Sequence, residues 1–517
     1  MTTSSAPDRA PRRAEEEGGD MLSSPIDDEV AALQRRDPRG ASAAGGAIPL
    51  GSDATVPHAV GAAAASVWGD ETEIAAAAVA LASRRMSRPS DPKTTARPAS
   101  ELLADAGLTI TPEGLGADEA LRIFEDVIAP ATRAQDDPMN LAYIPAAPTR
   151  AALAFDAVVS SYNIFAGTWE SGAGAVFAEN QALAWLAELL SWPKTAGGCF
   201  ISGGTTGNLS ALVTARQFAR NQRGRHPVGQ WRLACTAQAH SSVHAAAAVL
   251  DAEVVIVPEN DDGQLTGEAL RTALVNSQDV FAVVASAGTT NAGIVDDLAG
   301  VAAVCERFGA WMHVDGAYGG AALAAPSVRH LFNGIERADS FIVDPHKWLF
   351  ATYDCCALLY RQPELARATH AQRAGYLDAI DREVWNPWDY GVHLTRRARG
   401  LPFWFSLATH GTDRYTMAIE QTLATARAVA SGIRAIPQLS LLVEPTLSVV
   451  LFERPGWDDL AYARWSRRLA LEGRILCIPT QWQGRTALRL AFVNPATEAD
   501  HVLEVLAETT ADPTGSA

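Results

Sequence analysis

The sequence lacks the features of a metal-bound, disulfide-stabilised or membrane protein. It has only six cysteines, none in a CxxC or Cys/His ligand pattern, so we expect reduced core residues and no structural metal. No apolar run approaches the ~20 residues that a membrane-spanning helix needs, and the N-terminus has no basic region followed by an apolar one. We therefore expect a cytoplasmic protein without membrane contact.

Positive charge is also scarce. The chain carries 42 Lys and Arg residues against 59 Asp and Glu residues, a net charge of −17. This acidic balance disfavours nonspecific binding to nucleic acid or anionic membranes, so no nucleic-acid partner is expected. The glycine-rich segment 201–208 has neither the P-loop lysine pattern nor a full GxGxxG, so neither an NTPase nor a Rossmann dehydrogenase is favoured.

What the chain does contain predicts an α/β protein with extensions. Residues 1–70 are rich in Ala, Gly, Ser, Pro and charge, which predicts a disordered low-complexity extension. Apolar residues at helical spacing in 71–145 predict an N-terminal helical arm that must pack on something else, plausibly a second subunit. Segment 146–395 alternates short apolar strands with helices, which predicts a mostly parallel central sheet covered on both faces. Residues 396–511 indicate a small α+β C-terminal domain, and 512–517 a loose tail.

The stretch Phe341–Phe350 delivers Lys347 directly after His346 at the end of an apolar run. Such a lysine is expected to be partly desolvated, which lowers its pKa toward the neutral amine that Schiff-base chemistry needs. On its own, the same lysine could simply extend from a strand end toward water. Other segments supply the chemical context.

Three strand ends carry small or polar residues. Gly204 and Thr205 open a helix after a strand, an arrangement that binds phosphate, although one glycine-rich turn is a weak signal. His240 follows another strand, where its ring could stack on a cofactor or serve only the structure. Thr290 ends a third strand and could bond a cofactor oxygen or cap a helix.

Asp315 ends a buried strand and needs a cationic partner, because burying an unpaired charge is costly. A protonated pyridine nitrogen would serve, and the small Ala317 leaves room for a flat ring. Four features together predict a pyridoxal 5'-phosphate site at the carboxyl ends of the strands. They are a helix start for the phosphate, a histidine ring for stacking, an aspartate for the pyridinium nitrogen and the imine-forming Lys347.

These motifs resemble those of the pyridoxal-phosphate-dependent group II amino acid decarboxylases, the family that includes aromatic L-amino acid decarboxylase. The resemblance runs from about residue 72 to 505 and rests on Ala239-His-Ser-Ser, Gly288-Thr-Thr, His313-Val-Asp-Gly-Ala-Tyr and Asp344-Pro-His-Lys-Trp-Leu. It implies the aspartate-aminotransferase-like fold (fold type I), an intertwined homodimer with sites at the subunit interface, and conversion of an L-amino acid to an amine and CO2.

The resemblance also implies a role for each site residue. Lys347 would carry the internal aldimine, Asp315 would pair with the pyridine nitrogen, His240 would stack on the ring, Ala317 would lie against its opposite face, and Thr290 would lie near the ring hydroxyl. The residues implied around the phosphate are Gly204, Thr205 and His346. Those implied in the substrate pocket, where packing is the alternative, are Tyr143 and Trp169.

Three departures from the family matter. Ala146 replaces a polar residue of the family's substrate segment, so a preference for a hydroxylated aromatic substrate is not assumed. Asp344 stands where the aromatic decarboxylases have asparagine, and its role is open. Pro387 aligns with the loop tyrosine that is thought to protonate the product carbon, leaving Tyr376 and Tyr390 as nearby candidates. Loss of that tyrosine is associated in this family with oxidative deamination, so an aldehyde synthase is the alternative function.

Two further alternatives are weaker. An aminotransferase would use a residue such as Arg489 for a carboxylate, although the favoured interpretation of that position is an ordinary surface arginine. A catalytically silent dimeric scaffold is disfavoured by the complete cofactor set. The tryptophans Trp385 and Trp388 favour an aromatic or otherwise flat substrate, with packing as the alternative.

Overall fold

The computed structural model describes most of the chain. The ranges described are 72–93, 95–224, 226–227, 229–372 and 383–511. The predicted extension 1–70 and tail 512–517 lie outside the described residues and stay predictions. No helix in the described ranges is long and apolar enough to cross a membrane.

The N-terminal described segment is helical, as its apolar spacing predicts. Its elements are α2 (Thr72–Ser87), α3 (Ala99–Ala106), α4 (Ala117–Ile123) and the π-helix η2 (Phe124–Ile128). Helix α2 buries none of its residues, and Val79 on it and Leu103 on α3 are exposed. The interpretation of 71–145 as an arm that packs on a second subunit stays a prediction.

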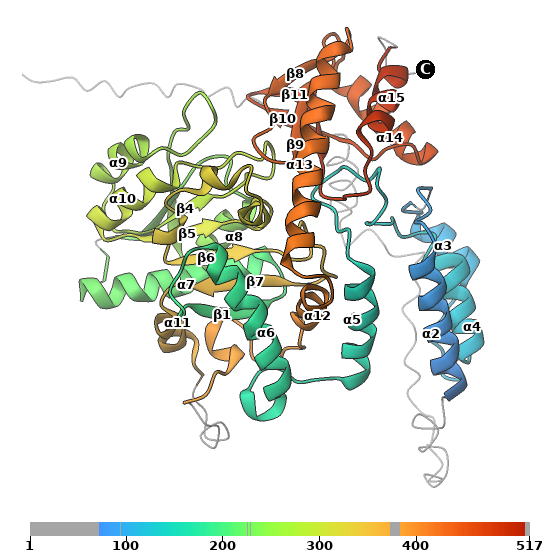
Figure 1. Cartoon of the computed structure of the whole chain (residues 1–517), viewed down its shortest axis with the longest axis horizontal. Helices are drawn as coiled ribbons and strands as arrows, with labels where there is room; N and C mark the ends of the chain where they lie inside the picture. Colours follow the sequence, from blue (N-terminus) through green and yellow to red (C-terminus); the bar gives the residue numbers. More distant parts are fainter. Residues whose placement is uncertain (1–71, 94, 225, 228, 373–382, 512–517) are drawn as a thin grey trace, which may run out of the picture. The chain divides into compact units, whose positions relative to one another are not determined.

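A seven-stranded sheet forms the centre of the chain (Figure 1). Its strands are β1 (Gly197–Ile201), β2 (Trp231–Cys235), β3 (Ala252–Ile256), β4 (Val280–Ser286), β5 (Trp311–Asp315), β6 (Ser340–Val343) and β7 (Cys356–Tyr360). They lie in the order β1-β7-β6-β5-β4-β2-β3, and β7 runs antiparallel to both of its neighbours while the other pairs are parallel. The predicted mostly parallel sheet is confirmed.

Helices cover both faces of this sheet. Within β4, Val283 and Ala285 pack into one apolar cluster and Val284 into another, as expected for a strand with two buried faces. The first cluster includes residues of α6 (Trp169–Leu189), α9 (Gly267–Val275) and α10 (Leu298–Phe308), and the second includes residues of α7 (Gly204–Arg223) and α8 (Ser241–Val249). The strand ends are therefore held by a sheet that is packed on both faces.

Local chemistry sets several helix ends. Thr149 begins α5 (Arg150–Tyr162), because its hydroxyl accepts from the Ala152 backbone N–H at 3.0 Å. Short 3-10 turns and one further helix complete this part of the chain: η3 (Gly319–Ala324), η4 (Arg329–Phe332), η5 (Ile335–Arg337), α11 (Pro363–His370) and η7 (Pro387–Tyr390).

Two residues shape local features of the C-terminal part. Gly411, with φ of +76°, separates α12 (Leu401–His410) from α13 (Thr412–Ala435). The strand β10 (Ile478–Trp482) contains Pro479, which lacks a backbone N–H. The structure places β10 at a sheet edge, where a missing N–H is tolerated.

The remaining C-terminal elements follow the predicted α+β pattern. The small sheet is antiparallel in the order β10-β11-β9-β8, with β11 (Arg485–Ala491), β9 (Val449–Glu453) and β8 (Ser440–Val443). Its helices are α13, α14 (Asp459–Glu472) and α15 (Ala499–Thr509), which share one apolar core with the sheet. All six cysteines are buried and unpaired, as expected of core thiols.

Candidate active site

A cavity of about 320 Å³ lies where strands of the central sheet end. Its walls come from the segments that follow β1, β2, β4, β5 and β6, so residues far apart in the sequence meet at one edge of the sheet. Eight of the ten site residues predicted from the sequence line it: Gly204, Thr205, His240, Thr290, Asp315, Ala317, His346 and Lys347.

The start of α7 forms one wall of the cavity. The first N–H groups of any helix have no partner within the helix, and no side chain caps α7 at Gly203. A Cβ atom on Gly204 would lie 3.2 Å from both the Ala317 Cβ atom and an Asp344 carboxylate oxygen. Glycine therefore keeps open a space that faces helix N–H groups, which is suited to a phosphate.

Asp315 lies buried at the end of β5, with 8% of its surface exposed. One carboxylate oxygen accepts a hydrogen bond from the Asn208 side-chain amide at 2.8 Å, and the other accepts from the Ala317 backbone N–H at 3.0 Å. Both donors are neutral. The carboxylate is thus oriented without being neutralised, which suits a cationic ligand group.

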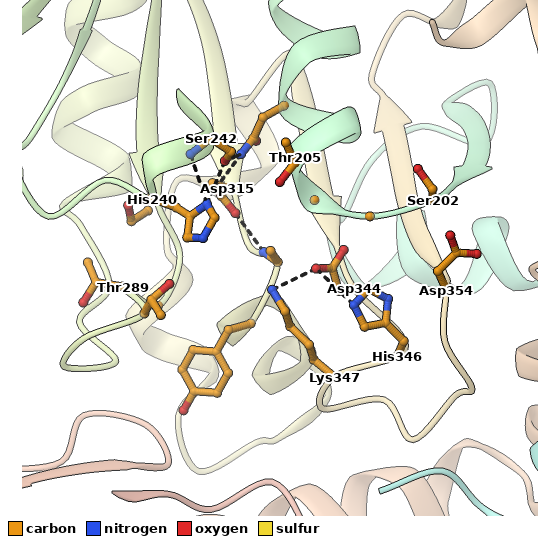
Figure 2. A pocket seen from close by; sticks show the side chains of 18 of the residues that line it. Ser202, Thr205, His240, Ser242, Thr289, Asp315, Asp344, His346, Lys347 and Asp354 are labelled. Atoms are coloured by element: carbon orange, nitrogen blue, oxygen red, sulfur yellow. Dashed lines mark hydrogen bonds and ion pairs between the residues drawn. The ribbon is translucent and has the colours of Figure 1, made fainter. Parts of the chain in front are cut away.

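Lys347 corrects one sequence-based expectation. Its ammonium nitrogen lies 2.9 Å from a carboxylate oxygen of Asp344, which is 2% exposed (Figure 2). Burial disfavours the charged amine, but the Asp344 carboxylate outweighs it, so the pKa of Lys347 is raised rather than lowered. Conversely, Lys347 and His346 outweigh the burial of Asp344 and lower the pKa of its carboxyl. Sequence reasoning counted desolvation alone and missed the partner.

This ion pair gives a testable prediction. Replacing Asp344 with Asn should lower the pKa of Lys347, because the dominant stabiliser of its charged form is removed. Since only the neutral amine attacks an aldehyde, covalent labelling of Lys347 by pyridoxal phosphate and borohydride should begin at lower pH. Mass spectrometry of the cofactor-free protein across a pH series measures that midpoint.

Asp354→Asn is the matched control, since Asp354 also lines the cavity but pairs with Arg399. It should leave the labelling midpoint of Lys347 unchanged. An Asp344→Asn midpoint equal to that of the wild type would show that Asp344 does not hold the charge of Lys347.

Thr289 and Thr290, which follow β4, have different surroundings. The sequence left two roles open for Thr290, a bond to a cofactor oxygen and a helix cap. The Thr289 hydroxyl accepts from the Ile294 backbone N–H at 3.1 Å and so holds the turn. Thr290 is exposed and lines the cavity. Thr289 therefore holds the turn, and Thr290 is left to line the cavity.

Neither predicted substrate residue lines this cavity. Tyr143 is 69% exposed, and Trp169 begins α6, where its N–H donates to the Asn386 side chain at 2.9 Å. The loop candidates differ from each other: Tyr390 is buried against the ring of Trp385, with centroids 4.3 Å apart, whereas Tyr376 lies outside the described residues.

The other loop tryptophan also packs within its own chain. Trp388 is buried and meets Phe165 edge-on, with ring centroids 6.1 Å apart. The Trp385 indole N–H donates to the Gly198 carbonyl at 3.2 Å. Both tryptophans therefore pack around η7 and do not line the cavity.

Two further residues at or near the cavity were not predicted as site residues. Tyr353 lines the cavity and is half exposed, with its ring centroid 4.9 Å from that of His346. Arg489 was expected at the surface, but this is wrong: it is 7% exposed, and burial lowers its pKa to about 10. It donates to the carbonyls of Thr290 at 2.8 Å and Tyr143 at 2.7 Å, and so ties β11 to two predicted site segments.

In the basic segment 396–399, Arg396 has a structural role. Arg396 is buried and forms two hydrogen bonds of 2.8 Å with the Glu179 carboxylate, and it also donates to the Ala166 carbonyl at 2.6 Å. The same carboxylate accepts from the Gly400 backbone N–H at 2.8 Å. This pair fastens the end of the loop to α6.

The cavity fits pyridoxal phosphate. It combines a helix start without a cap, a buried carboxylate held by neutral donors, a lysine and a narrow space beside Ala317. One group is unexpected: the Asp344 carboxylate lies beside the position of the Gly204 Cβ, near the proposed phosphate wall. Its pairing with Lys347 offsets that negative charge.

Comparison with known proteins agrees with this chemistry. Residues 107–454 match the family model of the pyridoxal-dependent decarboxylase conserved domain. An aromatic-L-amino-acid decarboxylase of Bacillus atrophaeus is 28% identical over 72% of this chain and 80% of that protein. An L-2,4-diaminobutyrate decarboxylase of Rhizobium meliloti (strain 1021) is 32% identical over 69% and 74%, respectively.

The fold is shared with a solved enzyme structure. The crystal structure of Oryza sativa TDC with PLP and tryptamine has a TM-score of 0.79 and 25% identity to this chain. The similarity covers 86% of this chain and 97% of that one. The aspartate-aminotransferase-like fold implied by the sequence motifs is confirmed.

Proposed function

This chain belongs to the pyridoxal-dependent decarboxylase family, and we propose that it decarboxylates an aromatic L-amino acid in the cavity around Lys347. Family membership makes it a pyridoxal-phosphate-dependent carboxy-lyase acting on an amino acid. The substrate class, the residue roles and the assembly below are proposals.

Each wall of the cavity has a proposed task. Lys347 would hold the cofactor covalently, and the start of α7 at Gly204 and Thr205 would bind its phosphate together with His346. Asp315 would hold a proton on the pyridine nitrogen. The imidazole ring of His240 and the methyl group of Ala317 would flank the cofactor plane. When bound, pyridoxal phosphate accepts the electrons left behind as CO2 departs.

The convergence of Lys347 and Asp315 on one cavity carries this proposal. It is tested by incubating the cofactor-loaded protein with the proteinogenic amino acids and L-2,4-diaminobutyrate, with products identified by mass spectrometry. An amine from an aromatic amino acid supports the proposal, whereas turnover of L-2,4-diaminobutyrate alone would replace the substrate class.

L-2,4-diaminobutyrate is included because a relative that is 32% identical to this chain is an L-2,4-diaminobutyrate decarboxylase. Three carboxylates line the cavity, and each has another cation in the proposed site. Asp344 pairs with Lys347, Asp354 pairs with Arg399, and Asp315 is assigned to the pyridine nitrogen. These carboxylates therefore do not favour a second ammonium group on the substrate, and the panel tests that directly.

An aldehyde synthase is the alternative reaction, and it depends on which group protonates the carbon that has lost CO2. We propose Tyr353 for this role in place of Tyr390, because Tyr353 lines the cavity while Tyr390 is buried in the loop. Burial raises the pKa of Tyr353, so its phenol keeps a proton to give at neutral pH.

Replacing Tyr353 with Phe should therefore shift products from amine toward aldehyde, ammonia and peroxide, because the unprotonated carbon persists long enough to meet oxygen. Tyr390→Phe is the control and should keep the wild-type ratio. The ratio is read by mass spectrometry with a parallel peroxide assay in air. If Tyr376→Phe shifts the ratio and Tyr353→Phe does not, the proton comes from Tyr376.

The proposed assembly is a homodimer in the cytoplasm. Exposed apolar side chains on α2, α3 and α5, including Val79, Leu103 and Tyr162, support a subunit contact there. The six buried thiols support a reducing compartment. Light scattering after gel filtration should give twice the chain mass of 54.7 kDa, and a single-chain mass would contradict the dimer.

A further inference from the structure

A chain of hydrogen bonds connects the buried Asp315 with His240. The Asn208 amide nitrogen donates to the Asp315 carboxylate at 2.8 Å and to the Ser242 hydroxyl at 2.9 Å. The Ser242 hydroxyl lies 2.8 Å from Nδ1 of His240 (Figure 2). Asn208 and Ser242 are both buried, so the two bonds donated by Asn208 are shielded from water.

The chain continues on the other side of Asn208. Its amide oxygen lies 2.7 Å from Nε2 of His313, a fully buried residue of β5. Nδ1 of His313 lies 2.8 Å from the Ser340 hydroxyl, which accepts a hydrogen bond from the Trp311 indole N–H at 2.8 Å.

One placement of protons satisfies every bond on the His313 side. A carboxylate at Asp315 accepts only, so Asn208 must turn its NH2 group toward it and its oxygen toward His313. Nε2 of His313 must then carry the proton, and Nδ1 accepts the hydroxyl proton of Ser340. Burial lowers the pKa of His313 to about 4, which agrees with a neutral ring.

The same reasoning determines the ring of His240. The Ser242 backbone N–H donates to Nδ1 of His240 at 3.3 Å, so Nδ1 is an acceptor. The Ser242 hydroxyl, which accepts from Asn208, must then donate its own proton to Nδ1. Nδ1 therefore carries no proton, and the neutral ring holds its proton on Nε2.

We propose that Asn208 and His313 are positioning residues of the active site, which orient Asp315 and set His240 as the Nε2–H tautomer. The carboxylate is then aimed for a pyridinium nitrogen while His240 offers a donor to a ligand in the cavity it lines. This inference rests on the proposed roles of Asp315 and His240. It couples those two residues through the protein rather than through the cofactor.

The test compares two substitutions of His313. In His313→Gln, the amide can still donate to Asn208 and accept from Ser340, whereas His313→Leu keeps the bulk but neither bond. Pyridoxal phosphate is titrated into the cofactor-free full-length proteins and followed by visible absorbance, with thermal unfolding measured in parallel. His313→Leu should weaken cofactor binding about tenfold or more, because Asn208 loses the bond that orients it, and His313→Gln should stay within about threefold of wild type.

The outcomes separate positioning from a merely structural role. Equal loss of affinity in both variants, or wild-type affinity in His313→Leu with only a lower melting temperature, would overturn the proposal. Failure of the wild type to bind pyridoxal phosphate at all would instead contradict the proposed function, so the two failures are distinguishable.

A second variant reports on the tautomer if His313→Leu does not fold. The 15N spectrum of histidine-labelled full-length protein distinguishes protonated from unprotonated Nδ1, and the His240 signals are those lost in His240→Gln. Wild type should show Nε2–H alone, and Ser242→Ala, which removes the hydroxyl donor, should show a mixture of tautomers. A wild-type signal from Nδ1–H would overturn the proposal.

Discussion

Replacing Lys347 with Ala should abolish both the visible absorbance of bound cofactor and decarboxylation. The structure places this lysine in the cavity with its amine 2.9 Å from Asp344, and alanine has no group that can bind the cofactor aldehyde covalently. Removal of a covalent catalytic group costs on the order of 10⁴- to 10⁶-fold in turnover. Absorbance spectroscopy and CO2 release measure the two effects.

Lys347→Arg is the matched control for charge. Arginine keeps a cation for Asp344 but cannot act as an amine nucleophile at neutral pH, so it should be as inactive as Lys347→Ala. It should also retain more of the thermal stability, because the buried Asp344 carboxylate is not left unpaired. Full turnover with an unchanged visible band in either variant would refute the role of Lys347.

Replacing Asp315 with Asn should reduce turnover severely while sparing the fold. Losing one charge of a buried ion pair costs roughly 3–5 kcal/mol. If the pyridinium interaction is fully required in the transition state, turnover falls by about a hundredfold to several thousandfold. The cofactor-free protein should keep its melting temperature or gain slightly, because the two donors that hold this carboxylate, the Asn208 side chain and the Ala317 backbone N–H, are both neutral.

Asp296→Asn is the control, because it makes the same change from carboxylate to amide at another buried aspartate. Asp296 is also buried and accepts backbone N–H groups of Leu265 and Ser286 at 2.8 and 2.6 Å, but it does not line the cavity. Burial raises the pKa of Asp296 to about 7. Comparable turnover in Asp315→Asn and the wild type would remove the proposed electrostatic role of Asp315.

Much of the site could be predicted because its residues follow strand ends. Gly204, His240, Thr290 and Asp315 each come after an apolar run of strand length, and the carboxyl ends of parallel strands meet at one edge of a sheet. A local pattern therefore located most of the cavity wall without any knowledge of strand order.

Other features depended on contacts that no local pattern records. Arg489 has an ordinary sequence context, yet β11 places it beneath Thr290 and Tyr143. Strand β10 contains Pro479, which is tolerated there because β10 lies at the edge of the small sheet. Tyr353 follows the lysine motif by six residues, and only the turn of the chain before β7 brings its ring to His346.

The sequence by itself determined the kind of chemistry, since a lysine, a buried aspartate and a glycine-rich helix start are specified by residue type and by position after a strand. The tertiary structure decided the charge and direction of these groups. Asp344 outweighs burial at Lys347, and Asn208 lies 2.7 Å from His313 although 105 positions separate them in the chain. Electrostatic and hydrogen-bond energies depend on distance and partner, and strand order sets both.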